Sequence, residues 1–549
     1  MPNNRFNFSL LAKAIALTAG VLTLAACGDD DDKKASTPAA ATSNDANTVT
    51  VGNGAEPESL DLHKSSDSAS FNIMRQMFEG LVASDAEGKT IPGLAERWEN
   101  KDEKVWTFHL RDAKWSNGEP ITAHDFVFAL RRLTDPSTGS PYGSYLVDAK
   151  VINAAEIADG KAKADALGVK AIDDKTLEIT LAEPVPYLPE LFLLPVTYAV
   201  PKKVVEQHGD KWVAPENIVV SGAYKLAEWV VNGHIKLVRN PAYYDNGKTS
   251  IDNVMILPIN GIAELNRFKA GEMDVTAGVP LEQFQTLKTE MASQMQIAPR
   301  LCTSYLEFNN TKAPFNDAKV RQAISLLLDR DTLALKVAGR GEKPTYQFTP
   351  TTTQGMVEVK PEWASWDQAK RVAEATKLLN EAGYNDANPL KFEFLYNTSE
   401  SAKRMVTATS SLFSSSVKFV QPQPLNQEWK TSLETRRSGN YQVAYAAWCA
   451  DYNEPSTFLT VFKSGNGNNS GKFNSKQYDD VLNKTLLAGV TPEQRIELYR
   501  QAEQILQQDA AAAFIMNSVS VNLVNEDLKG YSNKDPMSNW RVKDWSFKD

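Results

Sequence analysis

The stretch AAWCADYNEPSTF, residues 446–458, brings together three side chains that can do chemistry. Trp448 offers an aromatic face, Cys449 a thiol and Asp451 a carboxylate, and the Asn-Glu-Pro that follows ends any regular structure. Such a thiol can form a disulfide or stay buried and free. Such a carboxylate can bind a cation or only shape the turn. Other features of the sequence are needed to choose between these alternatives.

Only two other cysteines, Cys27 and Cys302, occur in the chain. Cys27 is the last residue of the motif LAAC. This motif follows the basic residues Arg5 and Lys13 and a short apolar segment. The arrangement resembles the lipobox of bacterial lipoproteins. We therefore expect residues 1–26 to be a lipoprotein signal peptide and Cys27 to carry lipid. The alternative is an ordinary signal peptide that is cut nearby, with Cys27 incidental.

The polar run after Cys27 is rich in Asp, Ser, Pro and Ala and cannot support a core, so we expect residues 27–47 to be a lipidated, flexible tether. Cys302 and Cys449 then remain in an exported, oxidising setting, which favours a disulfide between them. Two buried free thiols are the alternative.

Length and charge narrow the class of protein. With 549 residues, the chain is too long for one ordinary core, and we expect two or three lobes. The formal charge is −9, or −11 once residues 1–26, with two basic and no acidic residues, are removed. An acidic protein with no long basic run is not expected to bind nucleic acid.

Signatures of catalysis are missing from the sequence. None of the five histidines is paired at i, i+4, and no HExxH, CxxC or GxSxG motif occurs. The glycines of GNGNNSGK lack the spacing of a phosphate loop. We therefore predict no catalytic residue, no metal site and no cofactor, and a binding protein rather than an enzyme.

Aromatic residues give the positive signal. The chain has 11 Trp, 17 Tyr and 22 Phe, and several lie beside polar residues in predicted loops: Tyr142, Tyr145, Tyr396, Trp429 and Trp448. Aromatic walls with few fixed charges suit a ligand that varies in its side chains but not in its backbone. Core packing is the alternative for each of them.

Strands and helices are mixed along the chain without strict alternation, which predicts a mixed α/β or α+β fold. Thr122 opens a helix, Gly383 follows the end of another, and Thr491 with Gln494 forms a capping box. The predicted strands are 48–54, 105–111 and 175–188, and the predicted helices are 122–133, 262–275, 316–337, 365–384 and 491–515.

Three long runs resemble one family. FEGLVASDAEGKTIPGLAERWENKDEKVWTFHLRDAKWSNGEPITAHDF, LCTSYLEFNNTKAPFNDAKVRQAISLLLDRD and WCADYNEPSTF are similar to the large solute-binding proteins of peptide ABC importers, solute-binding protein family 5. They are most similar to its oligopeptide-binding and murein-tripeptide-binding members. The resemblance runs from about Asn53 to the C-terminus.

This resemblance implies a three-lobed α/β clamshell that encloses a peptide as an extended strand between lobes I and III. The expected chain crossings lie near Leu301–Cys302 and near Asn517–Val519. The implied segments are 48–78, 202–301 and 519–549 for lobe I, 79–201 for lobe II and 302–518 for lobe III.

The resemblance also implies roles for single residues. Asp451 would pair with the α-ammonium of the peptide, and Cys302 and Cys449 would form the family disulfide. Arg436 would bind a carboxylate of the ligand. The residues implied to line the peptide groove are Tyr142, Glu307, Trp429, Trp448 and Asn397.

The chain departs from the family at basic residues that receive the peptide C-terminus. Tyr445 stands where some members carry arginine, and a histidine and a lysine of some members are lacking around Ala402 and around Ala338. The preferred peptide length and the recognition of the carboxylate are therefore open. The lipobox is a further departure, and Gly28 after Cys27 is not the aspartate that retains lipoproteins in an inner membrane.

Together these features predict a monomeric receptor in the periplasm of a Gram-negative bacterium, held to a membrane by lipid only, that delivers oligopeptides to the permease subunits of an ABC importer. Within the same fold, a dedicated binder of murein peptides or of a non-peptide ligand such as haem is the alternative. A peptidase and a purely structural lipoprotein are alternatives from other classes.

Overall fold

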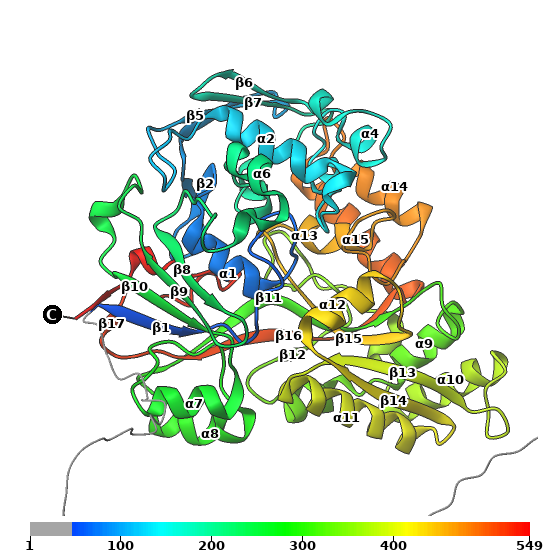
Figure 1. The fold of residues 1–549 in the computed structure, drawn as a ribbon. Coiled ribbons are helices and arrows are strands. Elements are labelled where there is room, and N and C mark those ends of the chain that lie inside the picture. Colours follow the sequence, from blue (N-terminus) through cyan, green and yellow to red (C-terminus); the bar gives the residue numbers. More distant parts are fainter. Residues whose placement is uncertain (1–46, 549) are drawn as a thin grey trace, which may run out of the picture. The chain divides into compact units, whose positions relative to one another are not determined.

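The computed structural model describes residues 47–548, which form three sheets of four or six strands, two small two-stranded sheets and the helices around them (Figure 1). The predicted signal peptide, Cys27 and nearly all of the predicted tether lie outside the described residues. Among the described helices, none combines the length and the apolar character that crossing a bilayer requires.

The first sheet has four strands in the order β1-β10-β9-β8, with β1 parallel to β10 and the other pairs antiparallel. Its first strand follows from the alternation in TVTVG, which buries Val49 and Val51 and leaves the threonines half-buried. The bounds are β1 Thr48–Gly52, β8 Tyr224–Val230, β9 His234–Arg239 and β10 Asn253–Leu257. Helices α7 (Gly261–Lys269) and α8 (Leu281–Glu290) follow β10 in the chain.

The second sheet is antiparallel, in the order β4-β5-β7-β6. In β5, alternation buries Trp106, Phe108 and Leu110 on one face. Helix α2 (Ala123–Thr134) packs on this sheet and begins after Thr122, as predicted, where the Thr122 backbone N–H donates to the Asp125 carboxylate at 2.8 Å. The bounds are β4 Ala95–Lys101, β5 Val105–Leu110, β6 Val169–Asp173 and β7 Thr176–Thr180.

The third sheet has six strands in the order β12-β16-β11-β15-β13-β14. Strand β13 is parallel to β14 and β15, and the other pairs are antiparallel. Helix α11 (Glu400–Ser416) packs on β13 and β14. The bounds are β11 Met295–Phe308, β12 Lys343–Pro344, β13 Leu390–Asn397, β14 Val420–Gln427, β15 Val443–Cys449 and β16 Ala512–Leu523.

Two long neighbouring strands, β11 and β16, pass through both predicted crossings and link the region of the first sheet to the rest of the third (Figure 1). Their ladder is irregular there, because the register shifts between Pro299 and Thr303. The paired strands therefore offer a place where the chain can bend, while the lobe boundaries themselves stay a prediction.

Two predicted helices end earlier than expected, and a third is divided. The helix predicted for 491–515 is α15 (Pro492–Gln508), and residues 512–515 belong to β16, because pairing with β11 and burial override the helix propensity of the alanines. The helix predicted for 262–275 is α7, which stops before Gly271 with its φ of 73°. The stretch 316–337 divides into α9 (Ala318–Leu327) and a π-helical segment, η6 (Thr332–Ala338).

Two predicted helix ends are confirmed. The Thr491 hydroxyl accepts from the Gln494 backbone N–H, and the Thr491 backbone N–H donates to the Gln494 side-chain oxygen, which is the predicted capping box. Helix α10 (Gln368–Glu381) ends at Ala382, and Gly383 follows with a φ of 90°, a conformation that glycine adopts without steric cost.

Candidate functional site

A cavity of about 610 Å³ lies where segments from the first and third sheets meet helix α1 (Ser68–Met77) and the loop around Tyr142. Six of the seven predicted ligand-binding residues line it. The seventh, Glu307, lies behind the cavity wall and contacts one of the six. The lining residues among the seven are Tyr142, Asn397, Trp429, Arg436, Trp448 and Asp451.

Asp451 is a buried carboxylate in this cavity that has no ion-pair partner among the described residues. Its side chain accepts a hydrogen bond from the Tyr142 hydroxyl, at 3.0 Å to Oδ2 and 3.2 Å to Oδ1. Burial raises the pKa of Asp451 to about 7, although the Tyr142 hydrogen bond and the charge of Arg75 oppose that rise. A cationic group in the cavity would supply the partner that this carboxylate lacks.

The turn that carries Asp451 is fixed on several sides. Cys449 forms a disulfide with Cys302, its direct partner across the β11–β15 ladder, so the alternative of two free thiols is excluded. The Trp448 indole N–H donates to the Thr457 carbonyl at 2.9 Å, and the Asp451 backbone N–H donates to the Thr457 hydroxyl at 2.8 Å. The carboxylate is therefore held in place before any ligand arrives.

Arg436 is already paired with Glu307. Its Nε and Nη2 donate to the two carboxylate oxygens at 2.8 and 2.9 Å, and the Tyr441 hydroxyl donates to the same carboxylate at 2.8 Å. The charge of Glu307 raises the pKa of Arg436, in spite of the burial that opposes it. Two of the guanidinium nitrogens are thus occupied, and only Nη1 is left for a further acceptor.

Trp429 and Asn397 lie near the same end of the third sheet, where Asn397 of β13 pairs with Gln427 of β14. Asn397 ends β13, and Trp429 begins helix α12 (Trp429–Arg437), which follows β14. The indole nitrogen of Trp429 is buried and finds no hydrogen-bond partner in the described part of the chain. It can therefore donate to a group in the cavity.

Ala338, Ala402 and Tyr445, at or near which the family resemblance implies missing basic residues, all line the cavity. Two arginines, Arg340 and Arg404, line it as well, each two residues beyond one of the alanines. Neither arginine was predicted from the sequence, although Arg340 and Arg404 are basic residues in the same short segments as the two alanines. Arg340 pairs with Glu342, and Arg404 pairs with Glu282.

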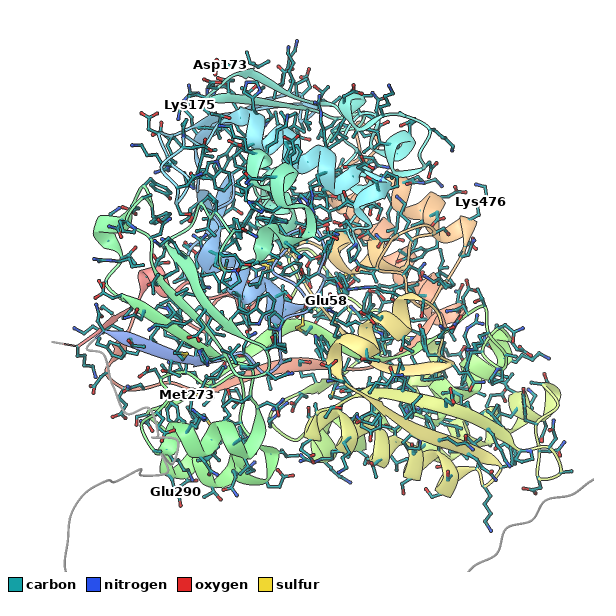
Figure 2. The ribbon with its side chains drawn as sticks, in the orientation of Figure 1. Glu58, Asp173, Lys175, Met273, Glu290 and Lys476 are labelled. Atoms are coloured by element: carbon teal, nitrogen blue, oxygen red, sulfur yellow. A yellow bond between two sulfur atoms is a disulfide. The ribbon has the colours of Figure 1, made fainter. Side chains whose placement is uncertain are left out.

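Ion pairs join the segments on either side of the cavity. Arg437 of α12 pairs with Glu58 and donates to the Ser66 hydroxyl at 2.6 Å, and Figure 2 labels Glu58 near the centre of the view. Arg404 of α11 reaches Glu282 of α8. Both pairs connect residues after 400 with residues before 300, so they hold the two walls of the cavity together.

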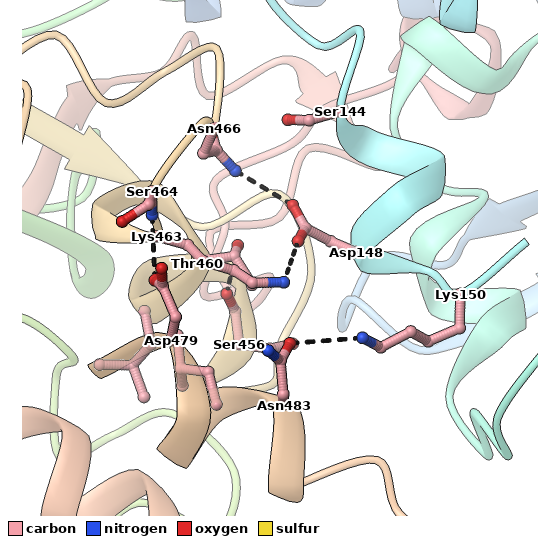
Figure 3. A network of polar contacts seen from close by, with 12 residues as sticks. Ser144, Asp148, Lys150, Ser456, Thr460, Lys463, Ser464, Asn466, Asp479 and Asn483 are labelled. Atoms are coloured by element: carbon pink, nitrogen blue, oxygen red, sulfur yellow. Dashed lines mark hydrogen bonds and ion pairs between the residues drawn. The ribbon is translucent and has the colours of Figure 1, made fainter. Parts of the chain in front are cut away.

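A second polar network joins residues 144–150 to residues 456–483 (Figure 3). The Asp148 carboxylate accepts from Lys463 Nζ and from Asn466 Nδ2, both at 3.1 Å. Lys150 Nζ donates to Asn483 at 3.5 Å. The segment that carries Tyr142 is therefore held near the one that carries Asp451.

Histidine, cysteine, aspartate and glutamate side chains nowhere gather in threes around a possible metal position within residues 47–548. Arg75 and Arg300, which line the cavity, were not predicted either. Their only signal in the sequence is a charge in an otherwise uncharged segment: Arg75 in SASFNIMRQM, and Arg300 just before Leu301 and Cys302.

The model of the family "Bacterial extracellular solute-binding proteins, family 5 Middle" matches residues 89–470. The chain is 47% identical over 538 residues to the periplasmic oligopeptide-binding protein OppA of Salmonella typhimurium, covering 97% of this chain and 98% of that protein.

Two solved structures have the same fold. Haemophilus influenzae OppA in complex with RPPGFSPFR matches with a TM-score of 0.90 and 44% identity, over 92% of this chain and 99% of that one. The Escherichia coli murein tripeptide-binding protein MppA matches with a TM-score of 0.89 and 38% identity, over 91% and 98%. An unliganded open form of MppA gives a TM-score of only 0.64, at the same identity and over 91% and 97%.

Proposed function

Because this chain belongs to the bacterial extracellular solute-binding proteins, family 5, we propose that it is the substrate-binding component of an ABC importer and that it captures oligopeptides for a membrane permease. The observation that carries this proposal is the buried Asp451 carboxylate in a cavity of about 610 Å³. A buried carboxylate held by a disulfide-linked turn is a ready partner for the α-ammonium of a peptide.

Each lining residue then has a role. Asp451 binds the α-ammonium, and the Tyr142 hydroxyl orients the carboxylate. Trp429, Trp448 and Asn397 line the groove, where backbone hydrogen bonds hold an extended peptide regardless of its sequence. Arg436 meets a ligand carboxylate through Nη1, while Glu307 fixes the guanidinium from behind.

Closure would be a hinge movement of lobes I and III, with segments 48–78, 202–301 and 519–549 forming lobe I and 302–518 forming lobe III. The irregular register of β11 and β16 supports a hinge there. A TM-score of 0.90 with a peptide complex, against 0.64 with an open form, supports a closed arrangement of the lobes in this structure. A ligand that bridges the lobes would favour that state.

Murein peptides are the second candidate ligand, since the chain is 40% identical over 483 residues to the murein peptide-binding protein MppA of Escherichia coli. Haem is less favoured, because none of the five histidines lines the cavity. The relatives are binding proteins, and we propose that this chain likewise has no enzymatic activity. Incubation with labelled peptides would reveal cleavage if it were a peptidase.

The relatives support a periplasmic location. We propose in addition that Cys27 is acylated and tethers a monomer to a membrane of a Gram-negative bacterium. Metabolic labelling with a fatty acid tests the anchor, with Cys27→Ser as the control variant. Label on the variant equal to that on the wild type would refute it.

The experiment that tests the proposed function is calorimetric titration with trialanine, pentaalanine and a murein tripeptide. The protein is first freed of bound ligand by unfolding and refolding. Binding of both alanine peptides, with weaker binding of their N-acetylated forms, is the expected result. If the protein bound the murein tripeptide and neither alanine peptide, murein peptides would replace general oligopeptides as the assigned ligand.

Affinity for peptides is expected to depend on pH. Since the pKa of Asp451 is about 7 in the free protein, ammonium binding below that pH requires loss of a proton from Asp451, and the affinity falls by about tenfold per pH unit. Above about pH 8 the peptide amine itself loses its proton. Titrations from pH 5 to 9 should therefore show a maximum between about 7 and 8. A constant dissociation constant down to pH 5 would contradict the assignment.

A further inference from the structure

Six arginines among residues 47–548 line the cavity, and four of them are neutralised by a carboxylate. The four pairs are Arg340–Glu342, Arg404–Glu282, Arg436–Glu307 and Arg437–Glu58. Arg75 and Arg300 differ, because neither side chain makes a hydrogen bond or an ion pair with any other described residue. The Nε of Arg300 is buried without an acceptor. Two unneutralised guanidinium groups in one cavity are costly unless something pairs with them.

The two arginines lie in the same region, next to the turn of Asp451. Arg300 precedes Leu301, whose carbonyl accepts from the Ala450 N–H at 2.8 Å and whose N–H donates to the Pro536 carbonyl at 2.7 Å. Arg75, on α1, has its guanidinium 5.9 Å from the centre of the Phe71 ring, which also lines the cavity. The charge of Arg75 acts on both Arg300 and Asp451.

Two carboxylates share this region with the arginines. Asp535 is buried, accepts the Met537 N–H at 2.8 Å, and leaves its second oxygen without a partner, yet it lies beyond ion-pair distance of both arginines. Asp451 is the second. When both carboxylates are ionised, two positive and two negative charges balance in the free protein. An ammonium at Asp451 adds one positive charge, and a negative group on the ligand would restore the balance.

We propose that Arg75 and Arg300 bind a carboxylate that the ligand carries within its first two residues, so that the protein prefers peptides with an acidic side chain near the N-terminus. This inference rests on the proposed function, since it assumes that the α-ammonium lies at Asp451. Guanidinium groups suit this role because they bind carboxylates through two parallel hydrogen bonds.

The test compares matched tetrapeptides that differ in one charge. Asp-Ala-Ala-Ala is titrated against Asn-Ala-Ala-Ala, and Ala-Glu-Ala-Ala against Ala-Gln-Ala-Ala. At least one acidic peptide should bind about tenfold more tightly than its amide, as expected for charge-assisted hydrogen bonds in a buried site. The pair Ala-Ala-Ala-Glu and Ala-Ala-Ala-Gln should show no such preference.

Variants then show which residues cause the preference for the acidic peptide. Arg300→Met should abolish the preference, so that the acidic peptide and its amide bind this variant with equal affinity. Arg500→Met removes the same charge from the surface of α15, outside the cavity, and should retain the full preference. Loss of the preference in both variants, or in neither, would overturn the assignment.

The comparison of acidic and amide peptides uses the wild-type protein, so it does not depend on whether a variant folds. It therefore tests the inference by itself. Equal affinity for both members of the first two pairs would overturn the inference and leave the proposed function standing. Failure of every tetrapeptide to bind would overturn the proposed function and the inference with it.

Discussion

Replacing Asp451 by asparagine should weaken the binding of a peptide with a free N-terminus by about 3–5 kcal/mol, which is a hundredfold to several thousandfold in Kd. The amide side chain keeps the size of the carboxylate and can still accept from the Tyr142 hydroxyl, but it leaves the buried ammonium without a counter-charge. The measurement is calorimetric titration near pH 7.5, where the peptide amine is still largely protonated (about pH 8 is its midpoint).

The N-acetylated form of the same peptide is the control for the Asp451 variant. It carries no ammonium, so wild type and variant should bind it with the same low affinity. Equal loss of affinity for both forms would indicate general damage to the cavity. An unchanged Kd for the free peptide would remove Asp451 from the site.

Removal of the disulfide, with Cys302→Ala and Cys449→Ala together, should lower the free energy of unfolding by about 5 kcal/mol at most. The bond joins residues 147 positions apart, so it constrains a long loop of the unfolded chain. The measurement is denaturant unfolding at equilibrium, followed by intrinsic tryptophan fluorescence. A peptide titration of the same variant should show weaker binding, because Asp451 lies two residues after Cys449.

Chemical reduction supplies the control for the double variant. A reductant should destabilise the wild type to a similar extent and leave the variant unchanged. Equal unfolding midpoints for the oxidised wild type and the variant would show that the bond contributes nothing to stability.

The local features of the site could be predicted from the sequence, because the residues concerned lie within a few positions of one another. The turn that follows Trp448 is an example, and the small number of cysteines made the pairing of Cys449 with Cys302 predictable as well. The family resemblance supplied the ligand role of Asp451, and the structure places that residue in the main cavity.

Contacts between distant segments could not be predicted in this way. Glu307 and Arg436 were both expected at the groove, but their mutual pairing joins residues 129 positions apart, and neither segment shows it alone. Arg75 and Arg300 reach the cavity from α1 and β11, far before Asp451 in the chain. Only the packing of these elements reveals that their charges meet.

The fold itself was predictable in class but not at every boundary. Capping residues marked the starts of α2 and α15 correctly, since a cap acts within one turn. The alanine-rich stretch that begins β16 was assigned to a helix, because its strand conformation comes from the neighbouring strand β11 and not from its own propensity.

The central claim is that this protein encloses oligopeptides of varied sequence, and native mass spectrometry tests it most directly. The protein is purified from export-competent cells without denaturation and measured before and after unfolding. We predict a spread of bound masses that is lost on unfolding and that sequences as mixed short peptides, with acidic residues enriched in the first two positions. A single non-peptide adduct would contradict it.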